Sequence, residues 1–229
     1  MNSEEVAKLE NELMLALGYE KYIAQGGDWG SMITKWIAEL FPENCIGIHL
    51  NLVIAFPPEG EDSMQGVLQE EIEGMKNIEK YQATGYGYFA IQSTKPQTVG
   101  YGLNDSPVGL AAWIIEKFHG WTKDDSDKLV VPLDEVLAIV SLYWHTESIT
   151  SSARFYYENG PLGFTFNPVS QPMAGAIFEN EIARPPRVWA EKIYNIVQWN
   201  QYPGGHFAAL ENPKILSEDI FNFAAKLEI

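Results

Sequence analysis

The chain contains a single cysteine and few basic residues. Cys45 is the only cysteine among 229 residues, so no disulfide can form within the chain. The 15 lysines and arginines face 31 aspartates and glutamates, which gives a formal net charge of −16. This shortage of positive charge argues against a nucleic-acid partner, because binding to the phosphate backbone requires a basic face. It also disfavours adhesion to anionic membranes.

Long hydrophobic runs are missing as well. No apolar stretch approaches the roughly 20 residues that a membrane-spanning helix needs, and the polar, acidic start Met1-Asn2-Ser3-Glu4-Glu5 is unlike a signal peptide. Cys45 lies in an apolar, strand-like run, which favours a buried thiol over a reactive one. We therefore expect a cytoplasmic chain with no membrane segment and no low-complexity tract.

The most informative pattern that is present is Gly26-Gly27-Asp28-Trp29-Gly30. It follows the apolar run 22–24 and precedes the amphipathic stretch 31–41, as in a nucleophile elbow between a strand and a helix. The small residues Gly26 and Gly30 are expected to allow the sharp turn. A carboxylate at the nucleophile position indicates attack on an electrophilic carbon through an alkyl ester, rather than acyl transfer. The alternative is that Asp28 only caps the following helix.

Hydrophobic periodicity predicts an α/β fold with a parallel sheet. The expected strands span 20–25, 45–50, 164–166, 174–178 and 196–199, and the expected helices outside the insertion span 4–17, 31–41, 186–193 and 214–226. In the first of these helices, the apolar residues Val6, Leu9, Leu13 and Leu17 are expected on one side. Between the Pro57-Pro58 break and about residue 160, the aromatic-rich helical stretches 64–82, 109–118, 133–144 and 151–157 indicate a lid. The predicted division is therefore core 1–56, lid 57–162 and core 163–229.

A histidine and an acid follow the elbow in the order that α/β hydrolases use, which is nucleophile, acid, histidine. His206 stands in Gly204-Gly205-His206-Phe207, just before the last predicted helix. Glu181 is the favoured acid, because it follows the strand expected over 174–178, and Glu179 is its near rival. Either glutamate can instead be a solvated loop charge.

Six segments of the chain match one known family, over nearly everything from about residue 18. They are Gly26 to Ser31, His49-Leu50-Asn51, Ile91 to Gly100, Leu103 to Trp113, Ser151 to Tyr156 and Gly204 to Glu211. In these segments the chain resembles the epoxide hydrolases of the α/β-hydrolase fold, in the microsomal-type branch with fungal and insect relatives. The long lid segment carries the most specific part of this resemblance.

The resemblance implies a two-step hydrolysis of an epoxide to a vicinal diol. Asp28 is then the nucleophile, His206 the general base and Glu181 the acid that orients it, while the lid residues Tyr88 and Tyr156 hydrogen-bond and protonate the epoxide oxygen. Eleven tyrosines are present, and composition alone does not select these two. The Trp29 backbone N–H is expected in the oxyanion hole and Phe207 in the substrate site. The implied substrate is a small apolar epoxide, with no metal or organic cofactor.

The chain also departs from the family. A His-Gly-x-Pro segment, which contributes to the oxyanion hole, is expected before the elbow, but nothing before Gly26 matches it. His119-Gly120-Trp121-Thr122 lacks the proline and lies in the lid. The sequence therefore resembles the C-terminal part of an epoxide hydrolase, and an exposed flank on the Asp28 strand favours homo-oligomer formation.

Two alternatives remain open at this stage. One is a truncated, catalytically weak or silent fragment, since loss of an oxyanion donor typically costs about 10²–10³ in rate. The other is a haloalkane dehalogenase, which also uses an Asp-Trp elbow. That enzyme needs halide-binding N–H donors where this chain has two lid tyrosines, so the lid favours the epoxide hydrolase. Detoxification, lipid epoxide metabolism and secondary metabolism are all compatible with the sequence.

Overall fold

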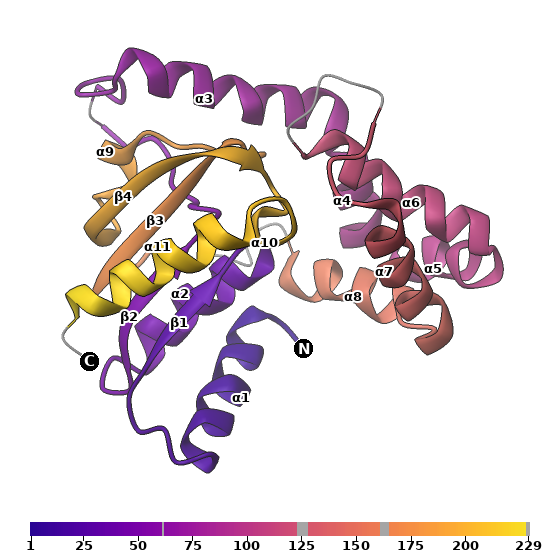
Figure 1. Ribbon diagram of the computed structural model, residues 1–229, viewed down its shortest axis with the longest axis horizontal. Coiled ribbons are helices and arrows are strands. Elements are labelled where there is room, and N and C mark those ends of the chain that lie inside the picture. Colours follow the sequence, from indigo (N-terminus) through magenta and orange to yellow (C-terminus); the bar gives the residue numbers. More distant parts are fainter. Residues whose placement is uncertain (61, 123–127, 161–164, 228–229) are drawn as a thin grey trace.

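The structure, a computed structural model, describes residues 1–60, 62–122, 128–160 and 165–227. Its centre is a four-stranded parallel sheet in the order β1-β2-β3-β4. The strands are β1 (Tyr22–Gly26), β2 (Cys45–Leu50), β3 (Val169–Asn180) and β4 (Tyr194–Gly205). The α/β class with a parallel sheet is thus confirmed, and its helices lie on both sides of the strands (Figure 1).

Alternating side chains of β3 divide the core between the two faces of the sheet. Met173 and Ile177 pack in one cluster with residues of α2 (Trp29–Leu40). Ala176 and Phe178 belong to a second cluster with α10 (Ala208–Glu211) and α11 (Pro213–Lys226). Because neighbouring residues of a strand point to opposite faces, β3 is buried on both sides, as expected in a parallel sheet.

The first helix, α1 (Ser3–Ala16), packs on α2 with a different face from the one predicted. Leu9, Leu13 and Leu17, which the sequence pattern placed on one apolar side, are 49 %, 57 % and 62 % exposed, so that side does not face the core. Ala7 lies in the core instead, where its small side chain allows close packing. Asn11 is buried beside it and accepts a 2.6 Å hydrogen bond from the Tyr22 hydroxyl. The buried face of α1 thus combines a small residue in the core with a specific polar contact to β1.

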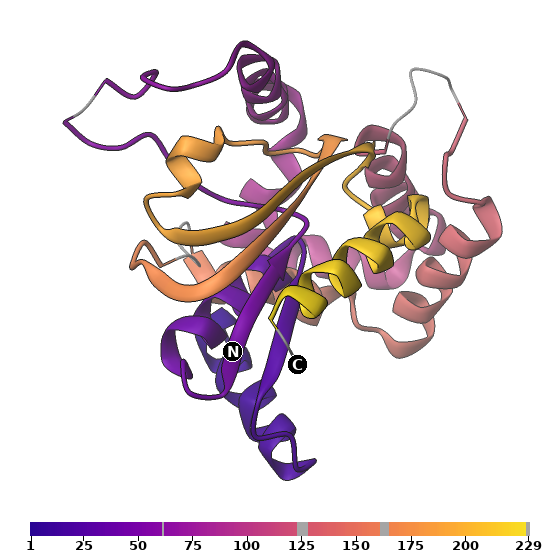
Figure 2. The same cartoon turned by 60° about the vertical axis from the view of Figure 1, so that its left-hand side comes forward.

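The segment between β2 and β3 is helical. It contains α3 (Gln69–Lys80), the π-helical turn η1 (Tyr81–Gly85), α4 (Gly87–Thr94), α5 (Pro96–Asp105), α6 (Pro107–Gly120), α7 (Leu133–Thr146) and α8 (Ile149–Asn159). Helices α4 to α8 gather beside the sheet, and α3 leads from the sheet to them (Figures 1 and 2). Sequence analysis did not predict α4 and α5 as helices. Helix α5 begins at Pro96, because proline is tolerated at the first helical position, where no N–H is needed.

Two further expectations about the second half of the chain need correction. Thr165 and Phe166 are not in a strand; the Thr165 hydroxyl accepts a hydrogen bond from the Asn167 N–H, which makes a turn. Phe164 and the predicted domain boundary between 162 and 163 lie outside the described residues. The helix predicted over 186–193 is the short α9 (Arg187–Ala190). Cys45 is a buried free thiol, and burial raises its pKa to about 11.

A buried polar network attaches α11 to the sheet. Asp219 Oδ2 lies 2.9 Å from His49 Nε2, and neither side chain is exposed. Asp219 also accepts hydrogen bonds from Gln198, Asn200 and Tyr202, at 3.0, 2.6 and 2.5 Å. All three donors are on β4, the strand that leads to His206. The network therefore holds the two elements on either side of the His206 loop together.

We expect Asp219→Asn to destabilise the fold, because breaking a buried pair on one side typically costs about 3 kcal/mol. At this size such a loss lowers Tm by roughly 6–12 °C. Burial raises the pKa of Asp219, but the hydrogen bonds from His49, Tyr202 and Asn200 outweigh it and lower that pKa to about 2. The carboxylate's contribution is thus complete above its unfolded pKa and disappears as pH falls through about 2.

Thermal unfolding at neutral pH measures this effect, and Glu218→Gln is the matched control. Glu218 precedes Asp219 on the same helix, and its side chain is 61 % exposed. We expect the control to melt like the wild type. Equal Tm values for Asp219→Asn and wild type would contradict the stabilising role of the network.

Within the described ranges, no helix has the length and apolar character needed to cross a membrane.

Candidate active site

The turn between β1 and α2 has the geometry of a nucleophile elbow. β1 ends at Gly26 and α2 begins at Trp29, with Asp28 as the N-cap. Asp28 adopts φ 51° and ψ −129°, a conformation that residues other than glycine rarely adopt. Such strain costs on the order of 1–3 kcal/mol and is concentrated at functional sites. Asp28 therefore caps the helix and is also held in a strained position that exposes its carboxylate.

Close packing against backbone at Gly26 and against a side chain at Gly27 explains two of the three glycines in the elbow. A Cβ on Gly26 would lie 2.1 Å from the Gly30 carbonyl oxygen, and a Cβ on Gly27 would lie 2.5 Å from Asn51 Nδ2. A Cβ on Gly30 would meet no atom within 4 Å. The turn therefore requires a small residue at Gly26. At Gly30 a side chain would meet no protein atom, and it is the Gly30 carbonyl that approaches Gly26.

Asp28, His206 and Glu181 meet at the carboxyl ends of the parallel strands. His206 Nε2 lies 2.9 Å from Asp28 Oδ2, and His206 Nδ1 lies 2.6 Å from Glu181 Oε1. The side chains of His206 and Glu181 are 4 % and 2 % exposed, whereas 43 % of the Asp28 side chain is accessible. The structure thus brings together three residues that the sequence separates by up to 178 positions, with the carboxylate of Asp28 as the accessible member.

The two glutamates that sequence analysis left as candidates lie in different surroundings. Glu181 Oε1 accepts a second hydrogen bond, 2.7 Å long, from the Ile182 N–H, which fixes the carboxylate beside the imidazole. Glu179 is exposed, and its backbone carbonyl accepts hydrogen bonds from Asn77 and Arg184. Glu181 is therefore the glutamate in contact with His206.

The charges of this group favour an ionised resting state. Burial alone would raise the pKa of the Asp28 carboxyl, but the hydrogen bond and charge of His206, with the Trp29 N–H, hold that pKa below its usual value. Burial lowers the pKa of His206, yet Glu181 and Asp28 outweigh it and raise that pKa well above the ordinary value. Both shifts favour the charged pair, in which an Asp28 carboxylate accepts a hydrogen bond from a protonated His206.

Two lid tyrosines lie over the elbow. The ring centroids of Tyr88 (α4) and Tyr156 (α8) are 5.8 Å apart, and the Tyr156 ring is 5.1 Å from the Trp29 ring. Burial raises the pKa of both phenols, and the negative charge of Asp28 adds to the effect. Both side chains consequently remain neutral hydrogen-bond donors beside the carboxylate.

Trp29 and Phe207, the other two predicted site residues, lie next to Asp28 and His206. The Trp29 N–H donates a 2.6 Å hydrogen bond to Asp28 Oδ1. The Phe207 ring stacks on Phe118 of α6 with centroids 4.0 Å apart, and it lies 5.1 Å from the His206 ring. The Trp29 N–H is thus placed to hold one carboxyl oxygen. Phe207 packs against the lid helix, and its contact with substrate remains a prediction.

Sequence analysis missed several neighbours of the two phenols. They are Tyr81, whose hydroxyl is 3.2 Å from that of Tyr88, and Phe89, Lys117 and Trp121. Phe155 instead contacts the Trp29 ring. The Trp121 carbonyl also accepts a 2.8 Å hydrogen bond from the His206 N–H. Tyr81 begins the π-helical turn η1, a backbone irregularity that the sequence pattern does not predict.

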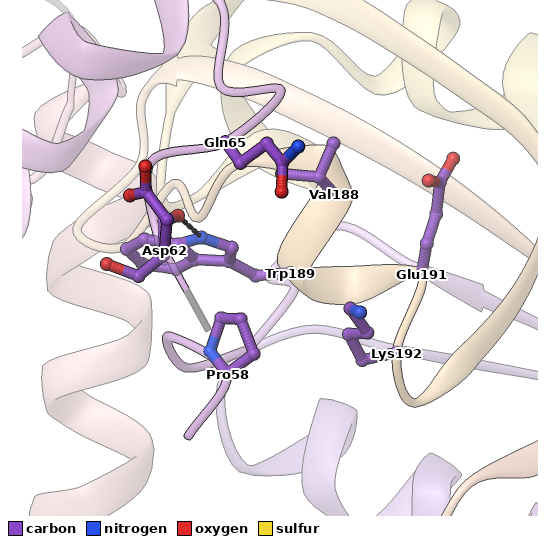
Figure 3. Close-up of a pocket in the computed structure, with 8 residues that line it drawn as sticks. Pro58, Asp62, Gln65, Val188, Trp189, Glu191 and Lys192 are labelled. Carbon is purple, nitrogen blue, oxygen red and sulfur yellow. Dashed lines mark hydrogen bonds between the residues drawn. The ribbon is translucent and has the colours of Figure 1, made fainter. Parts of the chain in front are cut away.

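A cavity of about 240 Å³ elsewhere in the molecule is separate from this site. It lies between the loop after β2 and α9, and its lining includes Pro58, Asp62 and Trp189 (Figure 3). The Trp189 indole donates a 2.7 Å hydrogen bond to the Ser63 carbonyl, which ties the loop to α9. None of the residues around Asp28 lines this cavity.

A parallel sheet with a strained elbow, a histidine and an acid after its last strands, and a helical insertion together define the α/β-hydrolase fold. A carboxylate occupies the nucleophile position in this case.

Comparison with known proteins gives the family. The chain is 41 % identical to a putative epoxide hydrolase of Stigmatella aurantiaca over 222 residues, which is 96 % of this chain and 50 % of the relative. It is 38 % identical to epoxide hydrolase 1 of Sus scrofa, with 99 % and 56 % of the two chains covered. No model of a protein family matches the sequence.

Solved structures agree. The epoxide hydrolase of Aspergillus niger superposes with a TM-score of 0.89 at 33 % identity, covering 99 % of this chain and 58 % of that one. The juvenile hormone epoxide hydrolase of Bombyx mori gives 0.88 at 31 %, with 100 % and 60 % covered. The chain belongs to the epoxide hydrolases of the α/β-hydrolase fold, and it spans about half the length of the curated relatives it matches.

Proposed function

We propose that this chain carries the catalytic centre of an epoxide hydrolase, which adds water to an epoxide through an ester on Asp28. One observation carries the proposal: an accessible carboxylate at a strained elbow faces two neutral phenols and also contacts a histidine–glutamate pair. A nucleophile, a donor for the epoxide oxygen and a base for water are therefore adjacent.

In the first step, a carboxylate oxygen of Asp28 bonds to one epoxide carbon while the bond from that carbon to the ring oxygen breaks. The ring oxygen receives a hydrogen bond and then a proton from the lid phenols, Tyr88 and Tyr156. Their neutrality supports this role, because burial keeps the protons on both hydroxyls until negative charge develops on the substrate.

The second step follows from the electrostatics of His206. Ester formation removes the negative charge from Asp28, and one cause of the raised His206 pKa disappears with it. The imidazole then loses its proton to solvent and acts as a base toward water, oriented by Glu181. Water attacks the ester carbonyl, whose oxygen the Trp29 N–H stabilises at the position of Asp28 Oδ1, 2.6 Å away.

Hydrolysis completes the proton balance. The oxygen of the water stays on Asp28, one of its protons reaches the second hydroxyl of the diol through His206, and the other restores the lid phenol. The regenerated Asp28 carboxylate raises the pKa of His206 again, and the imidazole recovers its proton from solvent. No step draws on a metal or an organic cofactor.

The surroundings of Asp28 support an apolar epoxide substrate, since aromatic rings of Trp29, Phe89, Phe155 and Tyr156 contact one another there. Haloalkane dehalogenation is less well supported, because neutral phenols suit a leaving oxygen that needs a proton.

A weak or silent fragment remains the alternative, since the chain spans about half the length of its relatives. The division into core 1–56, lid 57–162 and core 163–229, the cytoplasmic location and the homo-oligomer remain predictions.

An isotope experiment tests the reaction and its ester together. The chain is mixed in excess with styrene oxide in water enriched in oxygen-18, and the product and the peptide containing Asp28 are weighed by mass spectrometry. We expect the diol of the first turnover to carry unlabelled oxygen and the Asp28 peptide to gain the label. Labelled diol with an unlabelled peptide would mean direct attack of water, and no diol at all would favour the silent fragment.

A further inference from the structure

A lysine of the lid places its charge on the face of Tyr88. Lys117 is on α6, its side chain is 14 % exposed, and its Nζ lies 4.3 Å from the centroid of the Tyr88 ring. The same Nζ is 5.4 Å from the Trp121 ring and 6.0 Å from the Trp113 ring. An ammonium within about 6 Å of an aromatic face interacts with the ring, most strongly when little water is present.

The other groups around Tyr88 oppose negative charge on its phenol. Burial contributes most to its raised pKa, followed by the neighbouring hydroxyls of Tyr156 and Tyr81 and the carboxylate of Asp28. Negative charge must nevertheless develop on the Tyr88 oxygen when its proton moves to the epoxide oxygen and the ring opens. Among the described residues, the cation over the Tyr88 ring is Lys117, which reaches the ring from α6.

We propose that Lys117 is a positioning residue that acts through Tyr88: its charge on the ring face stabilises the phenolate that forms as Tyr88 protonates the opening epoxide. This inference rests on the proposed epoxide hydrolysis and adds a residue that supports proton transfer from Tyr88. Among the described residues, the lysine lies over the ring of Tyr88 and no cation lies over that of Tyr156.

The surroundings of Lys117 favour this role over simple packing. Taking an ammonium largely out of water is costly, and an apolar side chain of similar length would fill the same space among three aromatic rings. The ion-pair partner of Lys117 is Glu116, 2.5 Å from Nζ, whose side chain is 64 % exposed. The ammonium contacts this exposed carboxylate on one side, so a substitution at Glu116 should change the electrostatic effect of Lys117 on Tyr88.

Step-resolved kinetics test the proposal with Lys117→Met, Lys117→Arg and the control Lys95→Met. Lys95 is an exposed lid lysine at the end of α4. In single-turnover experiments with styrene oxide, we expect Lys117→Met to slow ester formation by about 3- to 30-fold. Ester hydrolysis should be unchanged, Lys117→Arg should restore ester formation, and Lys95→Met should match the wild type. Equal losses in both steps, or no rescue by arginine, would overturn the proposal.

A second measurement does not depend on turnover. With 3,5-difluorotyrosine at position 88, ¹⁹F NMR follows the ionisation of that phenol directly. Its pKa should rise in Lys117→Met and stay near the wild-type value in Lys117→Arg and Lys95→Met. Glu116→Gln, a surface change that leaves the fold intact, should lower the same pKa because it removes the anion beside the ammonium.

The two measurements separate failure of this inference from failure of the proposed function. If no variant or wild type forms diol, epoxide hydrolysis by this chain is refuted, and the ¹⁹F titration still decides whether Lys117 controls Tyr88. A pKa at position 88 that is indifferent to both Lys117→Met and Glu116→Gln would refute the role of Lys117, whatever the turnover.

Discussion

Replacing Asp28 by asparagine should lower diol formation by at least about 10³-fold, the scale of loss when a nucleophile is removed from an enzyme. The amide keeps the size of the side chain, but it lacks the negative charge that attacks the epoxide carbon. Asparagine also tolerates the positive φ of this position better than most residues, so the elbow should remain folded. The measurement is steady-state diol formation from styrene oxide, with circular dichroism as the check on folding.

Asp105→Asn provides the matched control for this change. Asp105 is an exposed aspartate at the end of α5, in the same chain but outside the cluster around Asp28. We expect wild-type turnover from the control. Residual turnover of Asp28→Asn above about a tenth of the wild type would show that Asp28 is not the nucleophile, whereas loss of activity in both variants would point to a general effect of amide substitution.

The elbow was predictable from sequence because all its determinants are local. An apolar run, two glycines, a polar residue and an amphipathic segment follow one another within twenty residues. Each of them has a direct structural counterpart in β1, the close approach at Gly26, the N-cap Asp28 and α2. The order of Glu181 and His206 along the chain was equally informative, since the carboxyl ends of parallel strands meet at one edge of the sheet.

The orientation of α1 was not predictable in the same way. Its leucines suggested a buried face, but the packing on α2 selects the face with Ala7, and the hydrogen bond from Tyr22 fixes Asn11 beneath it. A residue from the next strand thus decides the orientation of the helix. Periodicity within one helix contains no information about such a partner.

The lid shows the same limit at the catalytic centre. Tyr88 and Tyr156 were chosen from eleven tyrosines through family resemblance, because their proximity depends on how α4 packs against α8. Lys117 and Tyr81 carried no signal at all. A cation over an aromatic face arises only after α6 and α4 are assembled, since Lys117 and Tyr88 are far apart in sequence.

His206→Gln should separate the two chemical steps, with the second one nearly abolished. Ester formation requires the Asp28 carboxylate, which the Trp29 N–H still holds in its ionised form. Hydrolysis requires a base, and glutamine has none. Mixing with styrene oxide should therefore give a rapid ester burst, followed by turnover at least about 10³-fold slower than in the wild type. Intact-protein mass spectrometry should show that the mass of the protein increases by the mass of the substrate. Analysis of its peptides should locate this increase on the peptide that contains Asp28.

The pH dependence of stability gives an independent check on the same substitution. Because Glu181 and Asp28 raise the folded pKa of His206 above 6.5, the charged imidazole stabilises the fold fully below that pH, and its contribution is lost as pH rises through the folded pKa. The Tm advantage of wild type over His206→Gln should consequently shrink at alkaline pH. His119→Gln, which changes an exposed histidine of α6, should show neither the ester nor the Tm difference. If His206→Gln forms no ester while it remains folded, His206 acts before the ester stage and the two-step assignment is wrong.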